Sequence, residues 1–331
     1  MIVPTPLMRH VTDDSGATKI DVETPDGLQS FATTDAFRRQ IADKLKIPFT
    51  YFERMRTEEP ALLDRNVDTW LHNEPEQRML RTLDGQARAF LSDRYRRLDN
   101  YDLLQHVFPM LKELPGARFE STELTPSRMY LKVVTSRIQF EIRPGDIVQA
   151  GVAISNSEVG QGTLSVQPLV YRLVCRNGLI AADRALRKTH VGRLSETSNE
   201  AVTVFKDDTL AADDKAFFLK VRDVVEAAVS DTTFVSVAEQ MRRTLGIKLV
   251  GDPAKTVEVL ATRYLLNERE RGGVLRALVA EADLSGYGLI NAVTGFAQEV
   301  EDYDRSTELE SIAGRMIQQN KTEWELLSAA L

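Results

Sequence analysis

Residues 146–175 read DIVQAGVAISNSEVGQGTLSVQPLVYRLVC and hold two runs that are rich in valine, isoleucine and leucine. Gly160 and Gly162 lie between the runs and favour a tight connection between two strands. These glycines lack the Lys-Ser/Thr ending of a phosphate-binding loop, and a strand rather than a helix is expected after them. The stretch therefore predicts a long two-stranded antiparallel ribbon closed by a hairpin loop, and not a nucleotide site.

The residues that flank this ribbon extend the predicted sheet. From residue 118 onward, further runs of β-branched and aromatic residues are separated by turn signals. After the ribbon, Asn177 and Gly178 form a dipeptide typical of a two-residue hairpin, which places Arg176 and Lys188 near one another on paired strands. We expect a central sheet of about four to six antiparallel strands.

Helical spacing dominates on both sides of the predicted sheet. Phe37 and Ile41 recur at a helical interval, Pro48 interrupts the pattern, and a second helix is expected from Thr50, so this part predicts a helical hairpin. After Asn199 the chain is helical in pattern almost to its end. The predicted fold class is α+β, with a central antiparallel sheet of long strands, an N-terminal helical hairpin and a helical C-terminal region.

Composition divides the chain into three predicted segments. Residues 1–30 carry prolines and glycines between short polar clusters, which predicts a weakly structured lead. Residues 31–198 hold the helical hairpin and the antiparallel sheet core, and residues 199–331 form the helical C-terminal region. The hairpin has the outline of a helix-turn-helix, but its second helix begins with the largely apolar FTYFERM, which favours packing over the reading of DNA bases.

The overall composition is that of a soluble globular protein. The 331 residues are 43% hydrophobic and 27% charged, with a formal net charge of −7. The longest apolar runs are far shorter than the roughly 20 residues that span a bilayer, and the N-terminus lacks the pattern of a secretory signal. A single cysteine excludes an internal disulfide and suits a reducing compartment. We expect a cytoplasmic protein with no membrane partner.

The motifs point to no catalytic residues, no metal and no cofactor. The four histidines are dispersed, and none has the spacing of a metal ligand. Cys175 has only His190 as a candidate base, so a buried packing role is expected for it. Glu141, Asp146 and Glu158 flank strands without the spacing of a two-metal site, and we interpret them as solvated edge residues. The sequence leans towards a non-enzymatic protein.

Basic residues and tyrosines give the stronger functional signal. Two basic stretches each surround a tyrosine, and guanidinium groups suit phosphate oxygens while tyrosine rings stack on unpaired bases. The alternative is that these cations pair with acidic residues of the chain, such as the run EVEDYDRSTELE at residues 299–310. The candidate nucleic-acid contacts are Arg94, Tyr95, Arg96, Arg97, Arg172, Arg176, Arg184, Arg187, Lys188 and Arg193.

Several segments resemble the phage/plasmid-like proteins of the domain of unknown function 932. The segments are AFLSDRYRRLDNYDLL, YRLVCRNGLI followed by RKTHVG, and GLINAVTGFAQEVEDYDRSTELESIAGRMI. The most specific parts are the Arg-x-Val-Cys-x-Asn-Gly core at residues 172–178, the Lys-Thr-His at 188–190 and the Asn-Ala-Val-Thr at 291–294. The resemblance runs from about residue 37 to near the C-terminus. It implies a cytoplasmic protein carried by prophages, phages or plasmids, without an established activity.

Two functional hypotheses follow from the sequence. The first is a homo-oligomeric protein that binds nucleic acid, with single-stranded DNA preferred, and that anneals strands in recombination. A sheet flanked by helices with basic residues on one side is similar to single-strand-annealing recombinases in architecture, which is an argument from analogy. The second is a non-enzymatic oligomeric scaffold or host-interaction protein, in which the arginines pair between subunits. A metal-dependent nuclease is the weaker third alternative.

Overall fold

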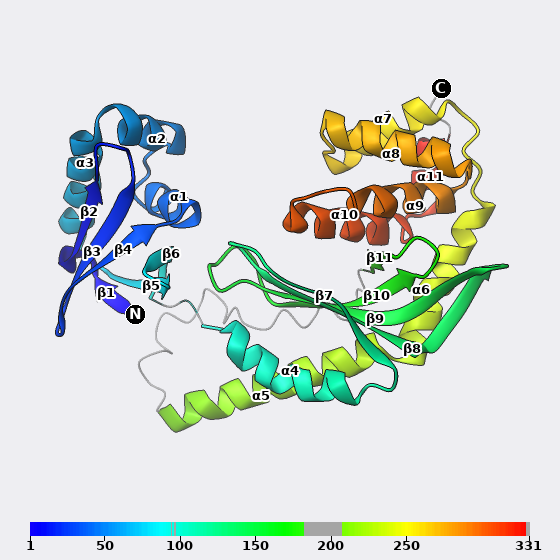
Figure 1. The fold of residues 1–331 in the computed structure, drawn as a ribbon, viewed down its shortest axis with the longest axis horizontal. Coiled ribbons are helices and arrows are strands. Elements are labelled where there is room, and N and C mark those ends of the chain that lie inside the picture. Colours follow the sequence, from blue (N-terminus) through cyan, green and yellow to red (C-terminus); the bar gives the residue numbers. More distant parts are fainter. Residues whose placement is uncertain (94, 96, 182–206, 329–331) are drawn as a thin grey trace. The chain divides into compact units, whose positions relative to one another are not determined.

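The computed structural model describes residues 1–93, 95, 97–181 and 207–328. Their secondary structure confirms the α+β class, because the strands of two sheets and the helices occur in separate blocks along the chain (Figure 1). Among these residues, none of the helices is long and apolar enough to cross a lipid bilayer.

The packing of the chain defines two compact units, whose boundaries cut across the three predicted segments. The first unit consists of Met1–Asn100, Pro126–Arg128 and Ser157–Thr163. The second unit consists of Tyr101–Thr125, Met129–Asn156 and Leu164–Leu331. Each unit has its own sheet and its own buried apolar cluster.

The first unit contains a six-stranded sheet in which β4 and β6 pair in parallel and the other neighbours are antiparallel. In spatial order its strands are β1 (Ile2–Pro4), β5 (Gln77–Leu83), β6 (Gln86–Ser92), β4 (Gly27–Thr33), β3 (Thr18–Thr24) and β2 (Met8–Thr12).

Residues 1–30 are therefore not the weakly structured lead that the sequence predicts. In β3, Thr18, Ile20 and Val22 are buried while Lys19 and Glu23 are exposed, which is the alternation of a half-buried strand. The prolines and glycines that prompted the prediction lie largely in the connections between these short strands. The prolines and glycines suggest a weakly structured segment, but the alternation of apolar and polar residues, which indicates strands, is the better guide here.

Three helices follow β4, where the sequence predicts a hairpin of two. They are α1 (Asp35–Lys44), α2 (Phe49–Glu58) and α3 (Pro60–Asn73). Thr34 caps α1 by accepting a hydrogen bond from the Phe37 amide. Pro60 occupies the first turn of α3, where the N–H that proline lacks would have no partner within the helix. The helices pack their apolar sides against the strands, with Phe37, Phe52 and Leu63 fully buried.

The predicted hairpin loop at residues 157–163 belongs to the first unit. Val159 is fully buried in a small cluster with Met79 and Leu91, and the Gln40 amide donates a 2.7 Å hydrogen bond to the Val159 carbonyl. The Gln40 amide oxygen also accepts from the amide of Phe90. The glycine-containing loop is thus packed by apolar and backbone contacts.

The second unit is built on a five-stranded sheet that is antiparallel throughout, and the pairing of β9 with β10 confirms the predicted ribbon. In spatial order its strands are β11 (Asn177–Ile180), β10 (Ser165–Arg172), β9 (Asp146–Asn156), β8 (Met129–Arg143) and β7 (Ala117–Leu124).

The turn between β10 and β11 lies at residues 173–176, and not at Asn177–Gly178 as the sequence predicts. Arg172 pairs with Asn177 across the two strands, so the dipeptide lies inside β11, and Arg176 takes a left-handed backbone with φ of 50°. A side chain at Gly178 would come within 2.9 Å of Leu169. The glycine therefore serves close packing of strands rather than a hairpin turn.

Helices surround this sheet, with α4 and α5 below it and α7 to α10 above it in Figure 1. Those described in the second unit are α4 (Asn100–Glu113), α5 (Asp207–Ala228), α6 (Asp231–Arg243), the short 3-10 helix η3 (Thr244–Gly246), α7 (Pro253–Tyr264), α8 (Glu268–Glu281), α9 (Gly286–Ala297), α10 (Tyr303–Met316) and α11 (Lys321–Ser328).

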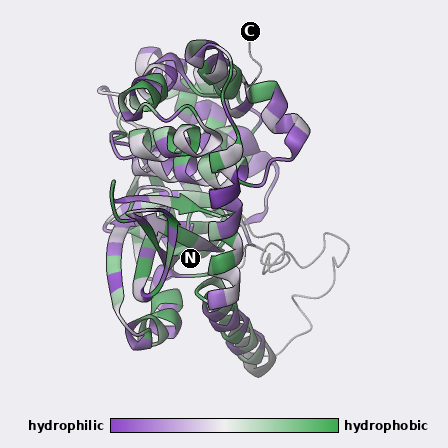
Figure 2. Cartoon of the chain, turned by 90° about the vertical axis from the view of Figure 1, so that its right-hand side faces the viewer, coloured by the Kyte–Doolittle hydropathy of each residue, from purple (hydrophilic) through white to green (hydrophobic). Residues whose placement is uncertain are grey.

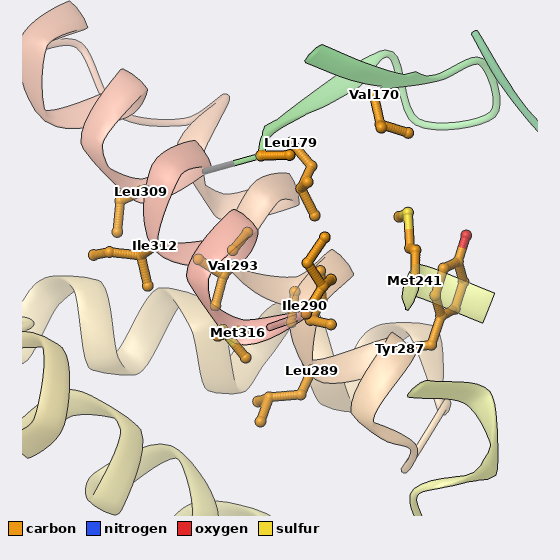
Figure 3. Close-up of a cluster of buried hydrophobic side chains, with 14 of the residues drawn as sticks. Val170, Leu179, Met241, Tyr287, Leu289, Ile290, Val293, Leu309, Ile312 and Met316 are labelled. Carbon is orange, nitrogen blue, oxygen red and sulfur yellow. The ribbon is translucent and has the colours of Figure 1, made fainter. Parts of the chain in front are cut away.

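The largest apolar cluster joins one part of this sheet to α6 and the C-terminal helices. Val170 and Leu179 of the strands lie above Ile290 of α9, while Ile312 and Met316 of α10 lie beside it (Figure 3). All five side chains are at most 2% exposed. Hydrophilic and hydrophobic residues alternate along the helices, as expected when one face of each helix packs inwards (Figure 2).

Candidate functional site

The Arg-x-Val-Cys-x-Asn-Gly core forms part of a buried polar network in the second unit. Arg172, at the end of β10, donates two hydrogen bonds of 2.8 Å from Nε and Nη2 to the two carboxylate oxygens of Asp146, at the start of β9. Tyr287 of α9 donates a third bond of 2.8 Å to Asp146 Oδ2. Arg172 is 5% exposed, Asp146 is 4% exposed and Tyr287 is fully buried.

This arrangement fixes the charge states of the network. Burial alone would raise the pKa of Asp146, but the hydrogen bonds from Arg172 and Tyr287 outweigh burial and hold that pKa below its usual 3.8. Burial and the bond to Asp146 raise the pKa of the Tyr287 hydroxyl, so it stays protonated and keeps its role as donor. Asp146 and Arg172 are therefore a bidentate ion pair inside the fold.

Asp146 is thus not the solvated edge residue that the sequence predicts. Its strand-flanking position suggested exposure, but the guanidinium that pairs with it lies on the neighbouring strand and α9 covers both. Glu141 does match the prediction, since it is exposed and accepts a hydrogen bond from the Gly145 amide. In the first unit, Glu158 is half-buried and pairs with Arg88.

Cys175 is exposed, contrary to the buried packing role predicted for it. It lies in the turn that follows β10, where its Sγ atom is 3.1 Å from Arg172 Nη1. Partial burial raises the pKa of the thiol despite the nearby guanidinium, so the thiol is protonated at neutral pH. This geometry does not give an activated nucleophile, and His190, the only candidate base, lies outside the described residues.

Arg143 and Asp283 extend the network towards the surface. Arg143 Nη1 is 2.7 Å from Asp283 Oδ2, and Arg143 Nε is 3.5 Å from Asp146 Oδ2. Ser285, which caps α9 through the Gly288 amide, also donates to Asp283. The network thus ties the start of α9 to the end of β8 and the beginning of β9.

The segments at residues 172–178 and 291–294 also contact each other, between β11 and α9. Asn177 of β11 donates a 2.7 Å hydrogen bond to the Thr294 hydroxyl of α9, and both side chains are buried. Asn291, one turn earlier on α9, is 1% exposed. The two segments are far apart in the sequence, and in the structure they form one helix-to-sheet contact.

A second buried ion pair attaches α10 to the same sheet. Lys132 of β8 donates a 2.5 Å hydrogen bond to Glu310 of α10, and its ammonium lies 4.8 Å from the centre of the Tyr303 ring. Glu310 is 3% exposed, and burial raises its pKa even though Lys132 opposes the shift. Sequence reasoning missed this pair, although a lysine within the apolar run MYLKVVT is a signal for a buried partner.

The structure divides the ten predicted nucleic-acid contacts. Arg172 is buried and engaged with Asp146, so its guanidinium is not presented to a ligand. Arg97 and Arg176 are exposed. Tyr95 is half-buried, and its hydroxyl donates to the Ser157 carbonyl, so its ring packs within the first unit. The remaining six lie outside the described residues: Arg94, Arg96, Arg184, Arg187, Lys188 and Arg193.

The described parts of the chain bring together no group of three or more His, Cys, Asp or Glu side chains that suits a metal ion. The chemistry available in the buried network is that of ion pairs and hydrogen bonds, and the charged groups of Arg172 and Asp146 are already engaged with each other. The role of the network in this structure is to hold β9, β10 and β11 to α9, while the Lys132–Glu310 pair holds β8 to α10.

The fold and the network define an α+β protein in which two sequence motifs, at residues 172–178 and 291–294, lie at the junction of an antiparallel sheet with its C-terminal helices. The family model described as domain of unknown function 932 matches residues 89–328, and the chain belongs to this family. The match begins within β6 and covers the network and all the C-terminal helices. The comparison with curated proteins and the comparison with solved structures each gave no match.

Proposed function

We propose that the protein binds nucleic acid, with single-stranded DNA as the preferred form, through the cations of residues 176–193. The observation that supports this proposal is the distribution of charge. Within this range Arg176, Arg184, Arg187, Lys188 and Arg193 stand against Asp183 alone, a surplus of four positive charges in a chain with net charge −7. Such a surplus attracts phosphates and releases their counterions.

The buried network sharpens this proposal by removing Arg172 from the contact set. Its charge is neutralised by Asp146 inside the fold, whereas Arg176 is exposed in the turn that immediately follows. Arg172 and Asn177 are paired across β10 and β11 and anchored to α9, so the basic range begins at a firmly held strand pair. Arg97 remains a second proposed contact, together with Arg94 and Arg96.

The biological setting is part of the same proposal. We infer a cytoplasmic protein of a phage or plasmid that anneals single strands in recombination and does so as a homo-oligomer. The family membership supports the setting only, because the family is described as one of unknown function. The mechanism is electrostatic neutralisation of the phosphate backbone, and no catalytic step is assigned.

The direct test is titration of a labelled single-stranded oligonucleotide at low and raised salt. Five phosphate contacts give a slope of log affinity against log salt of about −3.5 for a single strand. The variant Arg187→Glu/Lys188→Glu should bind more weakly and show a slope nearer zero. The control Lys255→Glu/Arg269→Glu makes the same change of charge at two exposed helix positions and should bind as the parent does. Equal loss in both variants would refute a localised site.

The scaffold hypothesis remains the second candidate because the rest of the chain offers an acidic partner for the same cations. Residues 199–331 carry 15 Lys and Arg against 23 Asp and Glu, a net charge of −8. Contact between the basic range of one copy and this acidic region of another would neutralise both. Under this candidate, Arg187→Glu/Lys188→Glu changes the mass in solution without any effect of DNA.

A further inference from the structure

A pocket of about 650 Å³ lies in the second unit, between the end of α6, η3, the end of α10 and α11. We call it the α6–α11 pocket. Its volume is within the range of sites for small organic ligands. Its lining includes Arg243, Ile247, Lys248, Ile317, Lys321 and Trp324.

The cations of the α6–α11 pocket outnumber its acids. Arg243, Lys248 and Lys321 line it together with one acid, Glu325, whose carboxylate is 3.7 Å from Lys321 Nζ. Arg243 and Lys248 are exposed, and within the described part of the chain neither side chain has a hydrogen-bond or ion-pair partner. Two cations beside one cavity with no acid to pair with suit a ligand that carries a phosphate or a carboxylate.

Apolar side chains form one side of the pocket, which we call its floor. Ile317 is 5% exposed and Trp324 is 3% exposed, and Ile247 is half-buried beside them. The Trp324 Nε1 donor and the Gln319 Oε1 acceptor are both buried without a hydrogen-bond partner among the described residues, which is unusual for buried polar groups. These two atoms have less than 1 Å² of accessible surface, so a ligand ring would contact the apolar side chains of the floor rather than bond to them.

We propose that the α6–α11 pocket binds a small molecule in which a flat ring is joined to an anionic group, with nucleoside monophosphates as the ligand class. The phosphate lies against Arg243 and Lys248, and the base packs over Ile247, Ile317 and Trp324. This site does not depend on the proposed binding of nucleic acid, because none of its residues belongs to the range 176–193.

The chain provides its own reporter for this proposal. It contains two tryptophans, Trp70 in the first unit and Trp324 in the pocket. The variant Trp70→Phe leaves Trp324 as the only source of tryptophan emission. Titration of this variant with adenosine monophosphate should give a saturable change in emission. Adenosine, which lacks the phosphate, and inorganic phosphate, which lacks the ring, should each bind at least about tenfold more weakly, since each loses one set of contacts.

A pair of variants in the Trp70→Phe background decides whether the pocket is the site. Arg243→Ala/Lys248→Ala should weaken adenosine monophosphate at least about tenfold, because hydrogen bonds to charged groups are lost. Lys255→Ala/Arg269→Ala removes two exposed cations away from the pocket and should leave the affinity unchanged. Absence of a saturable signal with adenosine monophosphate, or equal affinity in the two variants, would overturn the proposal.

Discussion

Replacement of Arg172 by methionine tests whether the sequence motif stabilises the fold or contacts a ligand. The change removes the two 2.8 Å hydrogen bonds to Asp146 and leaves that carboxylate buried at 4% exposure. Loss of one partner of a buried ion pair costs about 3–5 kcal/mol of unfolding free energy. We expect about 3 kcal/mol, the lower end, because Tyr287 still donates to Asp146 and Arg143 lies 3.5 Å away.

Urea unfolding of Arg172→Met in the Trp70→Phe background measures this cost, because Trp324 then reports on the second unit alone. Arg176→Met is the matched control, since it removes an exposed arginine from the adjoining turn and should cost less than about 0.5 kcal/mol. The double variant Arg172→Met/Asp146→Asn leaves no uncompensated charge, so it should be no less stable than Arg172→Met alone. An Arg172→Met protein as stable as the control but unable to bind DNA would refute the structural role.

Three further predictions concern the same region. Urea unfolding from pH 6 to pH 3 compares the unfolding free energy of the parent with that of Asp146→Asn. The parent should be more stable above pH 3.8 and should lose this advantage as the pH falls below 3.8, because the pKa of Asp146 in the folded protein is lowered from that value. A difference in stability that does not change with pH would contradict this prediction. Lys132→Met should lower the free energy of unfolding by about 3 kcal/mol or more at neutral pH, because it leaves Glu310 buried without the Lys132 ammonium. An unchanged urea midpoint would contradict a stabilising role for this ion pair. Gly314→Ala should destabilise by about 3 kcal/mol or more, because its new methyl group would lie 1.9 Å from the Ile180 carbonyl, whereas Gly295→Ala meets nothing within 4 Å and should be neutral or slightly stabilising.

The parts of the fold that the sequence predicted well are those in which one local signal decides the structure. The paired runs of residues 146–175 and the glycines between them specify an antiparallel ribbon, and Phe37 and Ile41 specify a helix, because strand and helix periodicities differ clearly. The first 30 residues were mispredicted because several short strands are packed between turns, and the turn residues dominate any window.

The buried network was beyond sequence reasoning for a different reason. Asp146 and Tyr287 are separated by 141 residues, and the local sequence around one does not predict a contact with the other. Asn177–Gly178 is a strong hairpin signal, but Gly178 pairs with Tyr171 across β10 and β11, so the dipeptide lies inside a strand. Tertiary contacts decide such positions, and they reverse the interpretation of Arg172 from a surface contact to an internal one.

The mass of the protein in solution, measured with and without single-stranded DNA, tests the central claim most directly. The proposed function predicts that the parent gains mass in the presence of DNA and that Arg187→Glu/Lys188→Glu fails to do so while keeping its mass without DNA. A parent whose mass is the same with and without DNA, together with a variant whose own mass is altered, would contradict nucleic-acid binding and support contacts between copies of the chain.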